Sequence, residues 1–174
     1  FEVSFKPVEG AFRVNETVTV LGEAKNYAGS SVDGAQVRYR VVRQARFPWW
    51  DWWKIAGPYS TEQMEIMNGE AVTRADGSFE IKFTAQPDPT IPKTAQPMFT
   101  FRVMADVTDI TGETRSSETS ISAGYVALNV DFDLPREIEL DSLAHIAINT
   151  TNTAGQFQAA SGVINIQRLI EPKQ

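Results

Sequence analysis

The sequence predicts an all-β protein in which antiparallel strands pack as a sandwich, and three observations support this fold class. Apolar residues recur at every second position in several runs, which is the pattern of a strand with one buried face. Glycine-containing dipeptides typical of tight turns accompany these runs. No segment shows the apolar period of a long helix.

Seven strands are expected before residue 124. Their approximate ranges are 1–6, 17–27, 35–45, 62–67 with 70–74, 78–85, 97–108 and 113–122. Short strands of this number, with regular turn signals, are typical of a seven-stranded Ig-like sandwich.

Alternation is clearest in three of these strands, where mostly polar residues fill the positions between the apolar ones. The strand at 35–45 is expected to turn Val37, Tyr39 and Val41 inward. The strand at 78–85 is expected to bury Phe79, Ile81 and Phe83. The strand at 97–108 is expected to bury Phe99, Phe101, Val103, Ala105 and Val107.

The connections show two kinds of signal. Tight turns are expected at dipeptides that supply a residue tolerant of positive φ, namely Asp33-Gly34, Asn68-Gly69, Asp76-Gly77 and Thr111-Gly112. Two longer stretches, 46–61 and 86–97, are irregular. The second contains four prolines, so we expect it to be a stiff crossover between strands and not part of a sheet interior.

A second domain is expected to begin near Gly124. The run YVALNVDFDLP is expected to be a strand, because it alternates Val126, Leu128, Val130 and Phe132 with Ala127, Asn129, Asp131 and Asp133. Two more strands are expected in SLAHIAINTTN and SGVINIQRLI. Because three strands cannot close a sandwich, 124–174 is expected to be the N-terminal part of a second β-sandwich domain, truncated at Gln174. The alternative is that these strands pack onto the domain at 1–123.

Composition narrows the classes of partner and chemistry. The net charge of -6 and pI near 4.8 argue against a nucleic-acid partner, which would need a basic face. No apolar run is long enough for a transmembrane segment. The absence of cysteine excludes disulfides and thiolate sites, and no cofactor is expected. The chain opens on FEVSFK without Met, so we expect an excised segment whose signal lies elsewhere.

Residues 12–43, FRVNETVTVLGEAKNYAGSSVDGAQVRYRVVR, resemble the macroglobulin domains of the α2-macroglobulin superfamily, especially its bacterial members. The matching positions are Phe12, Arg13, Glu16, Thr17, Val18, Val20, Gly22, Ala24, Lys25, Tyr27, Gly29, Val32, Gly34, Ala35, Val37, Tyr39 and Val41. Two further stretches, TRADGSFEIKF (73–83) and ADVTDITGETR (105–115), look like hairpins of the same family. The resemblance covers residues 1–123 well and 124–174 more loosely.

The resemblance implies a non-catalytic scaffold in a bacterial α2-macroglobulin-like protease inhibitor. The family's thioester motif requires a Cys, which this chain lacks, so trapping activity is not carried over to it. The implied partners are neighbouring domains of the same parent chain and, through the parent, proteases. The implied location is extracytoplasmic, either periplasmic or anchored at the outer membrane.

All four tryptophans lie in FPWWDWW at 47–53, within the expected insertion at 46–61. Phe47, Trp49, Trp50, Trp52 and Trp53 are candidate interface or ligand contacts, because Trp is a common interface anchor. Three interpretations stay open: packing on this chain or a neighbouring domain, a partner surface, or a carbohydrate platform. The last would make the chain a carbohydrate-binding accessory sandwich.

Catalytic signals are weak. His145 is the only histidine, which argues against a Ser-His-Asp site or a His-based zinc site. The acid pairs Asp106/Asp109 and Asp131/Asp133 are better explained as solvated positions than as a glycosidase pair. Asp141-Ser142-Leu143 resembles the O-glycosylation site of Bacteroidetes periplasmic proteins, so Ser142 is a weak candidate for modification.

Overall fold

The computed structural model describes residues 1–8, 10, 12–47, 61–126, 128–133, 146–152 and 155–165. In this part of the chain the elements are β1 (Glu2–Phe5), β2 (Phe12–Arg13), β3 (Thr17–Lys25), β4 (Gln36–Arg46), β5 (Met64–Val72), β6 (Ser78–Thr84), the 3₁₀ helix η2 (Lys93–Ala95), β7 (Met98–Thr108), β8 (Thr114–Gly124), β9 (Asn129–Asp133) and β10 (Ala147–Thr151). No helix among these residues is long and apolar enough to cross a membrane.

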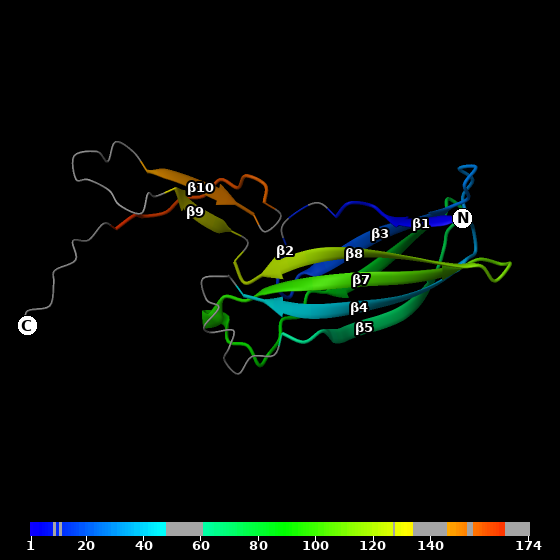
Figure 1. Ribbon diagram of the computed structural model, residues 1–174, viewed down its shortest axis with the longest axis horizontal. Coiled ribbons are helices and arrows are strands. Elements are labelled where there is room, and N and C mark those ends of the chain that lie inside the picture. Colours follow the sequence, from blue (N-terminus) through cyan, green and yellow to red (C-terminus); the bar gives the residue numbers. More distant parts are fainter. Residues whose placement is uncertain are drawn as a thin grey trace, which may run out of the picture.

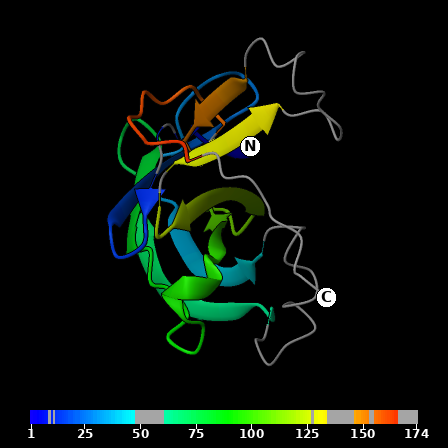
Figure 2. The same ribbon diagram turned by 90° about the vertical axis from the view of Figure 1, so that its left-hand side faces the viewer.

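Two sheets face each other as a sandwich (Figures 1 and 2). One sheet has the strand order β1-β3-β6, and the other has the order β2-β8-β7-β4-β5. All pairings are antiparallel except the short parallel pairing of β2 with β8. The predicted all-β sandwich is confirmed, and each of the seven expected strands is present.

The core lies between the two sheets and has the predicted residues except Tyr39, which is half-buried and packs against it. Phe79, Ile81 and Phe83 of β6 are at most 3% exposed. From the facing sheet, β7 buries its predicted residues and β4 buries Val37 and Val41. The Phe83 and Phe101 rings meet across the sandwich with centroids 5.7 Å apart. Burial of large side chains from both sheets is the main source of stability, at roughly 1.5–3 kcal/mol for each Val, Ile or Phe.

The expected turn at Asn68-Gly69 is wrong. Both residues lie inside β5, where Asn68 pairs with Arg40 and Gly69 pairs with Tyr39. A Cβ on Gly69 would lie 2.5 Å from Tyr39 Oη, so glycine is present here because an aromatic side chain covers it. The other three expected turns are confirmed, since Gly34, Gly77 and Gly112 all have positive φ.

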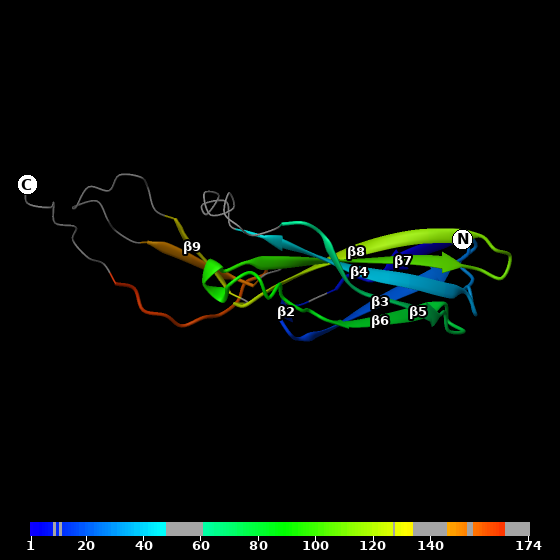
Figure 3. The ribbon, with the colours of Figure 1, turned by 90° about the horizontal axis from the view of Figure 1, so that it is seen from below.

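Residues after β8 form a separate two-stranded sheet, the β9–β10 hairpin, which lies beyond one end of the sandwich (Figures 1 and 3). The apolar side chains of this region are exposed, with Val126, Val130 and Phe132 at 59%, 45% and 53%. The physical reason is that no second sheet covers the hairpin in the described part of the chain. Of the expected last strand, residues 161–165 are not in a strand, and the rest lies outside the described residues.

Candidate interaction site at one end of the sandwich

Several strand ends meet at the end of the sandwich nearest the hairpin, which we call the junction end. Arg46, the last residue of β4, pairs with Met98, the first residue of β7, and Met98 pairs with Gly124 at the end of β8. The connection from β4 to β5 therefore leaves from the same end as the chain that leads to the hairpin. The predicted Trp-rich insertion belongs to that connection.

Of the predicted contact residues, Phe47 alone is described. It is half-buried and packs against the hydrophobic core. Trp49, Trp50, Trp52 and Trp53 lie outside the described residues, as do His145 and Ser142. Where the chain re-enters the sheet, Gln44 Nε2 donates a hydrogen bond to the Thr61 carbonyl at 3.2 Å. Both ends of the insertion are thus attached to β4.

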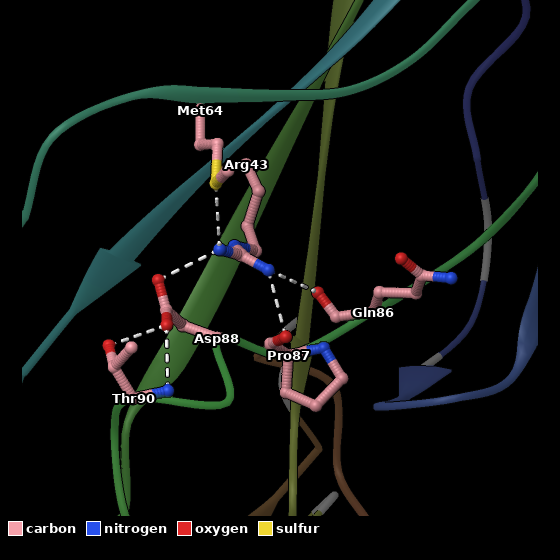
Figure 4. Close-up of polar contacts among 6 residues, drawn as sticks. All are labelled: Arg43, Met64, Gln86, Pro87, Asp88 and Thr90. Atoms are coloured by element: carbon pink, nitrogen blue, oxygen red, sulfur yellow. Dashed lines mark hydrogen bonds and ion pairs between the residues drawn. The ribbon is translucent and has the colours of Figure 1, made fainter.

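A buried arginine organises the junction end (Figure 4). Arg43 of β4 is 5% exposed. Its Nη1 donates to the Pro87 carbonyl at 2.8 Å and to the Gln86 carbonyl at 3.4 Å, and its Nη2 donates to Asp88 Oδ2 at 2.8 Å. These bonds hold the start of the proline-rich crossover (86–97) against β4. We call this set of contacts the Arg43 clasp.

Asp88 is fixed from its other side as well. Its Oδ1 accepts hydrogen bonds from the Thr90 amide at 2.9 Å and from the Thr90 hydroxyl at 2.6 Å. The Thr90 hydroxyl, and to a smaller extent the Arg43 guanidinium, hold the pKa of Asp88 below its ordinary value. The carboxylate therefore stays charged, which a buried guanidinium requires of its partner.

The crossover also contacts the chain that leads to the hairpin. Lys93 Nζ lies 5.4 Å from the centroid of the Tyr125 ring, a cation–π geometry. Tyr125 follows the last residue of β8, and its ring meets Phe99 edge-on with centroids 6.2 Å apart. The crossover thus links β4 to the first residue after the sandwich.

Sequence reasoning missed the Arg43 clasp, although a signal was present. In QVRYRVVRQAR, Arg43 has the same phase as the inward-facing Val37, Tyr39 and Val41. A charged residue at an inward position needs a buried partner. The partner lies 45 residues away in the crossover, so local pattern could not identify it.

The two acid pairs singled out from the sequence lie in different parts of the structure. Asp106 accepts a hydrogen bond from Ser116 Oγ, and Asp109 accepts from Thr111 and Glu113 in the β7–β8 turn. The Thr111 hydroxyl makes the largest contribution to the lowered pKa of Asp109. Asp131 and Asp133 lie on β9, beyond the opposite end of the sandwich. Within the described ranges, no cluster of three or more His, Cys, Asp or Glu could hold a metal ion.

Comparison with known proteins gives a fold relationship. No protein-family model matches the chain, and no curated protein matches it in sequence. A cryo-EM structure of the native conformation of E. coli α2-macroglobulin matches in fold with a TM-score of 0.58 and 6% sequence identity. The match covers 89% of this chain and 11% of that one, so the chain spans a small part of the length of this larger structure. The macroglobulin-type sandwich expected from the sequence is thereby supported by an independent structure.

Proposed function

We propose that this chain is a non-catalytic scaffold and interaction segment of a bacterial α2-macroglobulin-like protease inhibitor. The observation that carries the proposal is the fold match to E. coli α2-macroglobulin over 89% of the chain. The sequence pattern at 12–43 resembles the macroglobulin domains of the same family. The parent protein would be extracytoplasmic, periplasmic or anchored at the outer membrane, and this segment would need no cofactor.

The proposed segment contains two domains. Residues 1–123 form a macroglobulin-like sandwich with the Trp-rich insertion at 46–61, and residues 124–174 form the N-terminal part of a second sandwich. The separate β9–β10 sheet supports this division. A two-stranded hairpin is marginally stable alone, and Phe132 and Ile148 are 53% and 39% exposed, so further strands of the parent would complete the second domain.

The insertion would supply a contact to a neighbouring domain or partner, through Phe47, Trp49, Trp50, Trp52 and Trp53. The position of the insertion supports this proposal. The insertion leaves β4 at the junction end, beside the chain that leads to the second domain. The Arg43 clasp gives this end a fixed base, and tryptophan side chains are frequent anchors at interfaces.

A protease assay tests the scaffold role. The full-length parent should inhibit proteases acting on protein substrates, whereas the 174-residue chain alone should not. Stoichiometric inhibition by the 174-residue chain would contradict the proposal. So would a full-length parent that carries a hydrolase domain and no inhibitory activity.

The carbohydrate-binding alternative is favoured by the four tryptophans within seven residues. A fluorescence titration of the chain against a polysaccharide panel separates the two functions. We expect no saturable shift in Trp emission, and a saturable shift would favour the alternative. Hydrolysis assays with Asp106, Asp109, Asp131 and Asp133 individually replaced by Ala should show no turnover in either the wild type or the variants.

Ser142 is a further candidate for modification in the native host. If the Asp141-Ser142-Leu143 pattern is used, intact mass measured on the protein from its host should exceed the sequence mass by a glycan. The excess should disappear in Ser142→Ala, and an unmodified wild type would remove this candidate.

A further inference from the structure

Met64 is the exposed member of the contacts around Arg43. It is the first residue of β5, where the chain rejoins the sheet after the insertion, and it is 58% exposed. The other three methionines of the chain, Met67, Met98 and Met104, are half-buried. Met64 Sδ lies 3.5 Å from Arg43 Nη2 and accepts its hydrogen bond (Figure 4).

The hydrogen-bond acceptors around the Arg43 guanidinium differ in strength. Nη1 reaches two carbonyl oxygens, and Nη2 reaches the Asp88 carboxylate at 2.8 Å. The remaining acceptor of Nη2 is the Met64 thioether, which is a weak acceptor. Because Arg43 is 5% exposed, its guanidinium has little access to bulk water, which would offer a stronger acceptor.

We propose that Met64 is an oxidation site for peroxides and that its sulfoxide tightens the Arg43 clasp. A sulfur lone pair attacks one oxygen of hydrogen peroxide, the O–O bond breaks, and an S–O bond forms. The sulfur loses two electrons, and the second peroxide oxygen leaves as hydroxide and takes up the remaining peroxide proton to give water. The new oxygen is a strong acceptor placed next to Arg43 Nη2.

This outcome is the opposite of what oxidation usually does to methionine. In a core, the polar sulfoxide disrupts packing. At Met64 the side chain is mostly exposed and already faces a charged donor, so the added oxygen gains a charge-assisted hydrogen bond without being buried. Oxidation would then fasten β5 to β4 and the crossover, next to the end of the insertion.

Selective oxidation is the first test. The 174-residue chain is treated with dilute hydrogen peroxide, and peptide mass spectrometry follows the sulfoxide at each methionine over time. Met64 should oxidise several-fold faster than Met67, Met98 and Met104 because peroxide reaches it directly. Equal rates at all four positions, or slower oxidation of Met64, would overturn the proposal.

Thermal unfolding is the second test, with two substitutions as controls. Met64→Gln places an amide oxygen at the position the sulfoxide oxygen would occupy, and Met64→Leu removes the acceptor. Singly oxidised wild type and Met64→Gln should both melt about 2–4 °C above untreated wild type, the shift one added hydrogen bond gives in a chain of this size. Met64→Leu should show no rise, before or after peroxide.

The readouts are chosen to separate this hydrogen bond from a general effect of oxidation. Enzymatic reduction of the sulfoxide should return the Tm to its starting value. Rotation of the Arg43 Nη2 group, followed by NMR, should slow several-fold in the oxidised protein and in Met64→Gln. An oxidised wild type that melts at or below the untreated protein, with unchanged Arg43 rotation, would overturn the proposal.

Discussion

Gly22 of β3 lies opposite Phe79 of β6, and the Phe79 ring covers it. A Cβ built on Gly22 would lie 2.1 Å from Phe79 Cζ, far inside van der Waals contact. The ring is 1% exposed and meets Phe5 edge-on, with centroids 5.7 Å apart, so it has little room to move. The glycine that the macroglobulin-like sequence pattern includes is thus explained by packing and not by a turn.

Replacing Gly22 with alanine should destabilise the fold by about 1–3 kcal/mol, the usual range for overpacking a core. Urea unfolding of Gly22→Ala and wild type measures the difference. Gly162→Ala is the matched control and should be neutral, because no atom lies within 4 Å of the position that its Cβ would take. Equal stability of Gly22→Ala and wild type would show that the ring moves freely.

Asp88 gives a prediction with a pH dependence. Its pKa is lowered from the ordinary value of 3.8, chiefly by the Thr90 hydroxyl. The Asp88 side chain therefore loses its proton more readily in the folded protein than in the unfolded chain. The stabilisation is therefore present above pH 3.8 and is lost as the pH falls through the lower folded-state pKa.

The measurement is the difference in unfolding free energy between wild type and Asp88→Asn across the acid range. The variant should be less stable at neutral pH, because Arg43 loses its carboxylate partner. The difference should shrink as the pH drops below 3.8. A difference that stays constant with pH would mean that the charge of Asp88 does not stabilise the fold.

At the scale of elements, Thr73 fastens the end of β5 to the connection between β3 and β4. Its hydroxyl donates to the Val32 carbonyl at 2.7 Å and accepts from the Ala35 amide at 2.9 Å. Thr73 is 3% exposed, so water has little access to the hydroxyl that joins these two backbone groups. The bond pair sets the conformation of the turn in which Gly34 has a φ of 71°.

Thr73→Val keeps the shape of the side chain and removes both hydrogen bonds. It should cost about 1–3 kcal/mol, because the buried Ala35 amide and the part-buried Val32 carbonyl are left unsatisfied. Thr73→Ser retains the hydroxyl and should lose less. Thermal or urea unfolding of the three proteins decides the matter, and a valine variant as stable as wild type would contradict the role given to the hydroxyl.

The strands can be predicted from the sequence because their alternation is a local property. That pattern alone places Phe79, Ile81 and Phe83 correctly in the core. It fails at Asn68-Gly69, which has the composition of a turn, since the reason for Gly69 is the Tyr39 side chain on the neighbouring strand. The alternation pattern also cannot predict the Arg43–Asp88 pair, because the two residues are far apart in the sequence and come together only on folding.

The β9–β10 hairpin shows a second limit of predicting structure from sequence alternation. Alternation correctly indicates strands around Val130 and Ile148, but it does not say whether anything covers them. In the structure these side chains are 45% and 39% exposed. Whether an apolar face is buried depends on the other elements that pack on it. The alternation of a strand therefore predicts an apolar face but not what covers that face.

At the scale of the whole molecule, the two ends of the sandwich differ in chemistry. The end away from the hairpin carries tight turns closed by Asp76 and Asp109, whose side chains cap the turn amides. The junction end carries the Arg43 clasp, the crossover and the Lys93–Tyr125 contact. The junction end therefore connects β4, the crossover and the residue that leads to the hairpin through side-chain contacts.

The most direct test of the scaffold proposal is hydrogen–deuterium exchange on the full-length parent and on the 174-residue chain, read by mass spectrometry. Peptides covering 44–64 and 128–151 should exchange more slowly in the parent, because neighbouring domains or strands would cover them. Peptides from β6 and β7 should exchange equally in both proteins and serve as the internal control. Equal exchange of 44–64 and 128–151 in the two proteins would contradict the proposed role.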